Sequence, residues 1–157
     1  MKTLFLPLFA AMLATMSAAA LAAGPDPVVG TWQLNAAHST FTAGPALKSQ
    51  TRTYTQSDGG IALVMKTVTA DGHEVTTQTA YHLDGKDYPV TGTPDYDSLS
   101  AKQVNARTAS FTLKKGGKAV GTTTRTVSKD GKLLTSKTKL TTAQGDKSES
   151  VMVFDRQ

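Results

Sequence analysis

The chain has 157 residues, a formal net charge of +5 at pH 7 and no cysteine. The lack of cysteine excludes disulfide bonds, thiol redox chemistry and lipid attachment at an exported cysteine. Basic residues stand singly or in pairs near turn signals, as Lys114, Lys115 and Lys118 do, where they keep strand edges soluble. With so few aromatic residues beside them, this pattern argues against a nucleic-acid-binding protein.

The first 23 residues differ in character from the rest. Lys2 gives a positive start, an apolar run follows from Leu4 to Met16, and Ala20-Leu21-Ala22 fits the A-x-A cleavage rule. We therefore expect a signal peptide at residues 1–23, cleaved near Ala22 or Ala23, and a periplasmic or secreted protein. The alternatives are an uncleaved membrane anchor or a buried helix, although Gly24-Pro25-Asp26-Pro27 would end such a helix. Residues 24–157 form the single expected domain, with no integral membrane segment once the signal is removed.

Turn signals then recur along the chain at a regular spacing, among them Asp58-Gly59, Asp71-Gly72, Asp84-Gly85 and Asp130-Gly131. The stretches between them are rich in Val, Thr and Tyr, so the pattern predicts consecutive antiparallel hairpins. The expected strands are Gly30–Leu34, Gln50–Gln56, Ile61–Thr69, Glu74–Leu83, Asp87–Val90, Ser98–Val104, Thr108–Lys114, Lys118–Ser128, Leu133–Thr142 and Ser148–Asp155.

Two stretches interrupt this rhythm. Residues 35–49 show no alternation and contain Gly44-Pro45, which indicates a long connection or a short irregular cap. Residues 90–97 contain Pro94, which cannot lie in a central strand, so we expect a loop at one rim.

Alternation places the apolar residues on one face of each strand. The drier face carries Ile61, Leu63, Met65, Val75, Thr77, Thr79, Tyr81, Leu83, Ala109, Phe111 and Leu113. Large apolar residues are sparse and Thr fills many strand positions, which favours a barrel with a partly polar interior over a sandwich with two apolar faces. The sequence predicts an all-β fold, an antiparallel up-and-down meander of about eight to ten strands that closes into a barrel.

Polar side chains on that inner face are candidates for ligand binding. Arg52 and Tyr54 share one face of a strand, Tyr81 lies on the drier face, and Arg125 follows the small residues Gly121 and Thr123. A guanidinium inside a barrel needs an anionic or hydrogen-bonding partner, because an unpaired buried charge is costly. The alternative is that these arginines face water.

Residues for catalysis or metal binding do not form a pattern. His38 and His73 fall in a loop and a turn, and His82 stands alone on a strand, so no nucleophile with an oriented histidine is expected. Acidic residues and histidines lack the short spacings of a metal site. The sequence therefore favours a protein that is not an enzyme and needs no cofactor or metal.

Two terminal motifs resemble those of a known family. Gly30-Thr31-Trp32-Gln33-Leu34 and Val151-Met152-Val153-Phe154-Asp155-Arg156 are similar to the two signatures of the calycin group, the lipocalins and fatty-acid-binding proteins. The resemblance implies an up-and-down barrel of eight or ten strands around an apolar ligand cavity, closed at one end by Gly30, Trp32 and Arg156. Residues 84–92 also resemble small exported bacterial proteins described as lipocalin-like, without assigned activity.

One feature departs from that family. Fatty-acid-binding proteins hold the ligand carboxylate with an Arg and a Tyr on the last strand, where Met152 and Phe154 stand here. The expected function is that of an exported small β-barrel binding protein for an apolar or amphipathic small molecule. The alternative is a structural or envelope-associated interaction module with a filled barrel and no ligand. The sequence carries no signal for an oligomeric state.

Overall fold

The computed structural model describes residues 24–42 and 47–157, so the expected signal peptide at residues 1–23 lies outside the described residues. The elements are β1 (Gly30–Leu34), the 3₁₀ helix η1 (Ala36–His38), β2 (Thr40–Phe41), β3 (Ser49–Ser57), β4 (Gly60–Val68), β5 (Glu74–Tyr81), β6 (Asp84–Thr91), β7 (Ser98–Asn105), β8 (Thr108–Lys115), β9 (Lys118–Val127), β10 (Leu133–Thr141) and β11 (Lys147–Arg156). Within the described part of the chain, no helix is long and apolar enough to cross a membrane.

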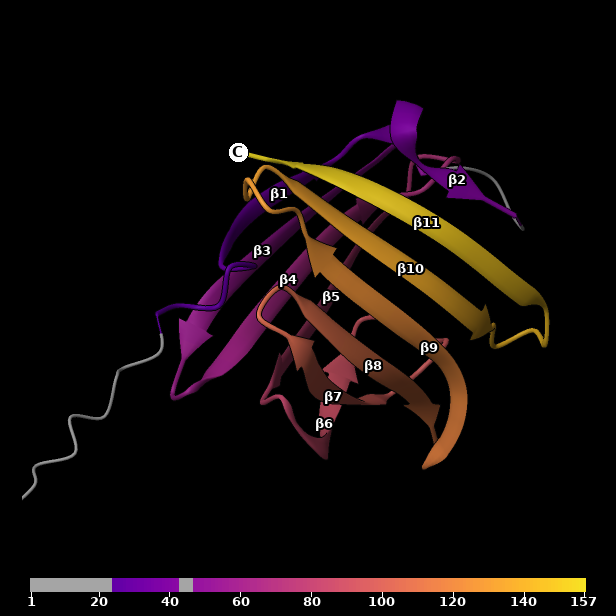
Figure 1. Cartoon of the computed structure of the whole chain (residues 1–157). Helices are drawn as coiled ribbons and strands as arrows, with labels where there is room; N and C mark the ends of the chain where they lie inside the picture. Colours follow the sequence, from indigo (N-terminus) through magenta and orange to yellow (C-terminus); the bar gives the residue numbers. More distant parts are fainter. Residues whose placement is uncertain (1–23, 43–46) are drawn as a thin grey trace, which may run out of the picture.

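The strands form one antiparallel meander that closes on itself (Figure 1). Strand β1 pairs with β3 on one side and with β11 on the other, so Trp32 lies opposite both Arg52 and Arg156. Tight turns impose the neighbour order: at the β3–β4 turn, Asp58 and Gly59 both have positive φ, as the favoured two-residue hairpin turns require. The predicted all-β, up-and-down barrel and its ten strands are confirmed.

Two local predictions about the strands were wrong. Strand β2, which pairs with β11 at Ser150 and Val151, was not expected, because two residues cannot show alternation. Asp84-Gly85 was expected to be a turn, but β6 begins there and its pairing with β7 shifts register between Asp84 and Asp87. Gly85 therefore adopts its positive φ at an irregularity in the β6–β7 pairing and not in a hairpin turn.

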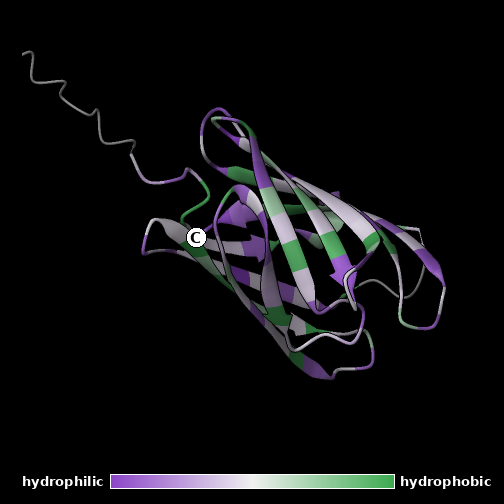
Figure 2. Ribbon diagram, turned by 90° about the horizontal axis from the view of Figure 1, so that it is seen from below, coloured by the Kyte–Doolittle hydropathy of each residue, from purple (hydrophilic) through white to green (hydrophobic). Residues whose placement is uncertain are grey.

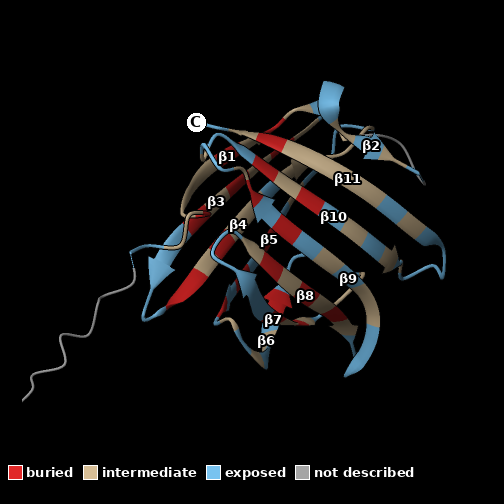
Figure 3. Cartoon of the chain, viewed as in Figure 1, coloured by how far each residue is buried: buried red, intermediate tan, exposed pale blue. Residues whose placement is uncertain are grey.

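The core lies on the inner face of the barrel, where the alternation predicted it. Figure 3 shows buried and exposed bands alternating along the strands, and Figure 2 shows the same alternation in hydropathy. Among the largest fully buried side chains, Val28, Trp32, Val127, Leu134 and Phe154 gather around β1 and the ends of β9, β10 and β11. We call this the closed end.

The opposite end, which we call the mouth, is formed by the loop of residues 92–97 and by the β8–β9 and β10–β11 turns. Hydrogen bonds join them: Gly116 N–H donates to an Asp97 carboxylate oxygen at 2.9 Å, and Ala143 N–H to one of Asp95 at 3.0 Å. Near this loop the sheet is weakly paired, because β5 and β6 share only two register pairs, Gln78 with Thr91 and Thr79 with Val90.

Candidate functional site

The barrel encloses a cavity of about 430 Å³ that reaches the mouth. Apolar side chains such as Leu63, Phe111 and Leu113 form part of its wall, and Arg52 and Arg125 supply charge. Small-molecule sites typically have volumes of roughly 300–1,000 Å³, apolar walls and a few polar groups that fix orientation. The lumen therefore has the size and wall chemistry of a small-molecule site.

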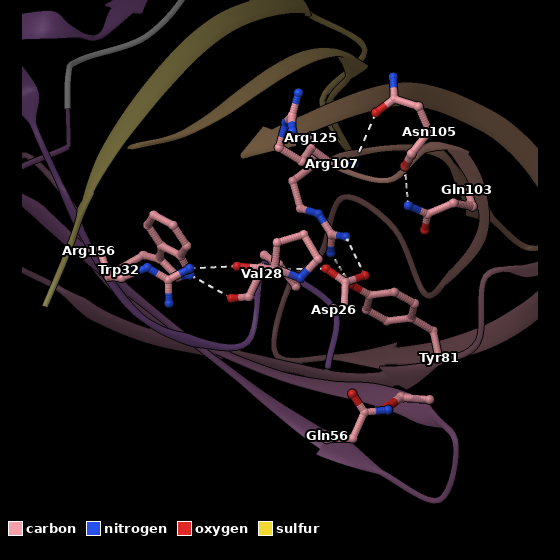
Figure 4. A network of polar contacts seen from close by, with 12 residues as sticks. Asp26, Val28, Trp32, Gln56, Tyr81, Gln103, Asn105, Arg107, Arg125 and Arg156 are labelled. Carbon is pink, nitrogen blue, oxygen red and sulfur yellow. Dashed lines mark hydrogen bonds and ion pairs between the residues drawn. The ribbon is translucent and has the colours of Figure 1, made fainter. Parts of the chain in front are cut away.

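The closed end is sealed around Trp32, which is fully buried. Its indole N–H donates to the Val28 carbonyl oxygen at 2.7 Å, and the Arg156 guanidinium lies 4.2 Å from the ring centroid (Figure 4). Arg156 also donates to the carbonyl oxygens of Pro27 at 2.6 Å and Val29 at 2.9 Å. One guanidinium thus fastens the N-terminal segment and covers the Trp32 ring.

Gly30 is required by this arrangement. Its φ is +138°, and a Cβ at this position would lie 2.6 Å from an Arg156 guanidinium nitrogen. A side chain at this position would be strained by the positive φ and would force the Arg156 guanidinium to shift. Of the three residues that the resemblance assigned to barrel closure, Arg156 thus lies against both Trp32 and Gly30.

Arg125 lies in the floor of the cavity, above the closed end, and its side chain is only 4% exposed. It forms an ion pair with Asp26 at 3.3 Å and donates a hydrogen bond to the Tyr81 hydroxyl at 2.7 Å (Figure 4). The rings of Tyr54 and Phe111 flank its guanidinium, at 5.6 Å and 5.4 Å. The charge of Arg125 is thus neutralised from within the chain.

The sequence pattern gave no sign of a role for Asp26 beyond its place in the segment expected to end a helix. The N-terminal segment folds under the barrel, and one Asp26 carboxylate oxygen accepts from Val28 N–H at 2.9 Å while the other faces Arg125. Burial raises the pKa of the nearby Tyr81 hydroxyl, and the positive charge of Arg125 offsets this only in part. Tyr81 is therefore neutral and accepts the hydrogen bond from Arg125.

Arg52 is in a different situation, although it is also buried, at 7% exposure. Its Nε donates to Gln50 Oε1 at 2.8 Å, one terminal nitrogen contacts Met152 Sδ at 3.9 Å, and the guanidinium lies 4.3 Å from the Phe154 ring centroid. Among residues 24–42 and 47–157, no carboxylate forms an ion pair with it. Since a guanidinium has five N–H donors, most of its hydrogen-bonding capacity remains available toward the cavity.

Met152 and Phe154 form the contact surface for the Arg52 guanidinium. They occupy the positions where fatty-acid-binding proteins have the carboxylate-holding pair, and here they form the surface against which Arg52 packs. In this chain the cation stands on β3, and the last strand supplies a thioether and an aromatic face. Cation–aromatic contacts of this kind stabilise a guanidinium without neutralising its charge.

Two tyrosines lie in the same part of the cavity as Arg52. Tyr54, two residues along β3, is buried, and Tyr96, from the loop of residues 92–97, is partly buried. Burial raises the pKa of Tyr96, while the positive charge of Arg52 lowers it in part. Sequence reasoning missed Tyr96, because it lies in a loop without alternation; its position shortly before Leu99 gave no sign that it points inward.

The structure offers few groups for other chemistry. The three histidines of the chain are all exposed, and His82 lies just beyond β5 instead of within a strand. In the part of the chain that the structure describes, no group of three or more His, Asp or Glu residues is placed to hold a metal ion. Arg52, Tyr54, Tyr81 and Arg125 are brought together around the cavity, with Arg125 and Tyr81 bonded to each other and Arg52 separate from them.

Comparisons with known proteins bear on the fold. No protein-family model matches the sequence, and no curated protein matches it either. Among solved structures, zebrafish ileal bile acid-binding protein complexed with cholic acid is similar at a TM-score of 0.50 and 11% identity, over 83% of this chain and 99% of that one. A redesigned beta barrel, mFAP1, bound to DFHBI, has a TM-score of 0.48 and 16% identity, over 83% of this chain and 95% of that one. The chain thus shares the barrel fold of a bile acid-binding protein, consistent with the calycin resemblance of its two ends.

Proposed function

We propose that the protein is an exported binding protein whose barrel holds an amphipathic small molecule, with one anionic group paired to Arg52 and an apolar part along the cavity wall. The observation that carries this proposal is the buried guanidinium of Arg52, which has no carboxylate partner in the described residues. Leaving such a charge unpaired is costly, so an anion that enters the cavity gains a charge-assisted contact with Arg52.

The two arginines of the cavity wall favour a ligand with a single negative group. Arg125 is already paired with Asp26, which leaves Arg52 as the cation available to a ligand among the described lining residues. The apolar wall then favours a hydrocarbon or ring body over a small inorganic anion. The cavity volume also favours a binding protein over the alternative, a structural module with a filled barrel.

A titration tests the site. Dodecanoate and the uncharged dodecanol are compared as competitors of a fluorescent fatty-acid analogue, with wild-type protein and the Arg52→Met and Arg125→Met variants. A charge-assisted hydrogen bond contributes roughly 1.5–3 kcal/mol, so Arg52→Met should weaken dodecanoate binding by about one to two decades and leave dodecanol nearly unchanged. Arg125→Met should act mainly on stability.

Two results would contradict the proposal. If the wild-type protein binds neither compound, the lipid-binding function is wrong. If dodecanoate and dodecanol bind equally well and Arg52→Met weakens neither, binding is purely apolar and Arg52 is not the anion site. Native mass spectrometry of protein purified from its own host would identify a ligand that co-purifies.

Export is a separate part of the proposal and depends on residues 1–23. The A-x-A pattern at Ala20-Leu21-Ala22 supports cleavage, so the mature protein should begin between Leu21 and Gly24. N-terminal sequencing of protein from the host's periplasm or medium checks this. Protein that begins at Met1 would remove both the signal peptide and the proposed location.

A further inference from the structure

The loop of residues 92–97 covers the mouth of the cavity. Thr93, Pro94, Asp95 and Tyr96 all line the cavity, although the chain has left the sheet at Thr91. The loop lies beside a part of the sheet with few strand pairs, since β5 pairs with β6 only at Gln78 and Thr79. This loop therefore supplies cover that no strand in the described part of the chain provides there.

The loop is attached firmly at one end. Asp97 N–H donates to the Lys114 carbonyl oxygen at 2.9 Å, the Asp97 carbonyl accepts from Val90 N–H at 2.9 Å, and its carboxylate accepts from Gly116 N–H. At the other end Gly92 has a φ of +85° and packs so closely that a Cβ would lie 1.8 Å from the Thr76 carbonyl oxygen. Gly92 thus fixes where the loop leaves the sheet, and Asp97 fixes where it rejoins the sheet.

Between these anchors the loop reaches across the mouth. The Asp95 carboxylate accepts from Ala143 N–H, in the β10–β11 turn, at 3.0 Å, and this contact is exposed to solvent. A single solvent-exposed hydrogen bond can break transiently at low cost, whereas the anchors at Asp97 consist of several bonds. Asp95 thus acts as a latch between the loop and the far rim.

Tyr96 is the aromatic residue of this loop that lines the cavity. Arg52, Tyr54 and Tyr96 all line this one cavity. Burial raises the pKa of the Tyr96 phenol, the positive charge of Arg52 lowers it and the Asp95 carboxylate raises it. The hydrogen bonds of the described residues include none from the hydroxyl of Tyr54 or Tyr96. Two phenols and a guanidinium with spare N–H groups are therefore available to an anion inside the same cavity.

We propose that Tyr96 is a direct contact of the ligand's anionic group beside Arg52, and that the loop of residues 92–97 is the lid that delivers it, held shut by the Asp95–Ala143 hydrogen bond. The ligand chemistry is a carboxylate or a similar singly charged oxyanion on an apolar body. This inference rests on the proposed function and adds a further contact residue and an entry route to it.

The affinity test compares two Tyr→Phe variants, which each remove one hydroxyl. Tyr96→Phe should weaken dodecanoate binding about tenfold and change dodecanol binding far less, because a hydrogen bond to a carboxylate is charge-assisted and one to an alcohol oxygen is weaker. Tyr88→Phe is the matched control, because the Tyr88 hydroxyl donates to Asp84 outside the cavity. It should bind both compounds as the wild type does.

The lid is tested by stopped-flow binding and by hydrogen exchange. Asp95→Ala should raise the association and dissociation rates of dodecanoate together, by about tenfold, and should speed exchange of the Ala143 amide in the protein without ligand. Asp146→Ala removes an exposed carboxylate of equal charge from the same turn and should change neither. The exchange measurement needs no ligand, so it reports on the latch independently.

The outcomes separate the two proposals. Loss of dodecanoate affinity in Arg52→Met but not in Tyr96→Phe would refute the role of Tyr96 and leave the proposed function intact. Rates and Ala143 exchange that are unchanged in Asp95→Ala would refute the lid. A wild-type protein that binds no anionic amphiphile would overturn both.

Discussion

The Asp26–Arg125 ion pair is the interaction most open to a quantitative test of this fold. Asp26→Asn keeps the shape of the side chain and its hydrogen bond from Val28 N–H but removes the negative charge. The exposures are 4% for the Arg125 side chain and 13% for that of Asp26, so the variant leaves a buried cation without a counter-ion. Removal of one partner from a buried ion pair lowers the free energy of unfolding by roughly 3–5 kcal/mol.

The expected cost lies near the lower end of that range. Arg125 retains its hydrogen bond to Tyr81 and its two aromatic neighbours, while the single amide oxygen that Asp26→Asn introduces keeps the bond from Val28 N–H. We expect a loss of about 3 kcal/mol in the free energy of unfolding. With a urea slope of about 2 kcal/mol/M, the unfolding midpoint should fall by about 1.5 M.

A double-mutant cycle distinguishes the ion pair from packing. Arg125→Met removes the cation, so the double variant with Asp26→Asn should be more stable than the sum of the single losses predicts, by about 1–3 kcal/mol. Asp58→Asn, in the exposed β3–β4 turn, is the control and should change stability by less than about 0.5 kcal/mol. Additive single effects, or an Asp26→Asn loss as small as that of the control, would show that Asp26 does not neutralise Arg125.

Three further predictions concern stability. Trp32→Ala should cost about 3–5 kcal/mol in urea unfolding, because a fully buried ring leaves a cavity; a nearly unchanged midpoint would contradict the closed end described here. The raised pKa of Tyr81 means that the folded state holds a proton which the unfolded state loses above about pH 10, so stability is fully present below that pH and declines as pH rises above it. Absorbance at alkaline pH should therefore show the Tyr81 phenolate only as the protein unfolds, and its appearance in folded protein near pH 10 would be evidence against the burial of this hydroxyl. Gly92→Ala should destabilise by at least about 2 kcal/mol more than Gly116→Ala, since both have positive φ but only Gly92 faces a backbone atom; equal losses would mean that the lid is not packed on β5.

Local sequence patterns determined the architecture. Turn residues with positive φ and the period-two alternation of strands act between neighbours in the chain, so hairpin order and the inward face of Leu63, Tyr81 and Phe111 followed directly. The same local reasoning misplaced the turn at Asp84-Gly85, because a Gly with positive φ serves a bulge as readily as a hairpin.

The partners of the inward arginines were decided only by closure of the barrel. Arg125 meets Asp26 across 99 positions of the chain, and Arg52 meets Met152 across 100. Alternation predicts that a side chain points inward. The groups that face one another across the lumen depend on strand number, tilt and stagger together. For that reason the sequence by itself identified two candidate arginines, and the tertiary structure paired one of them with Asp26 and left the other, within the described residues, without a carboxylate partner.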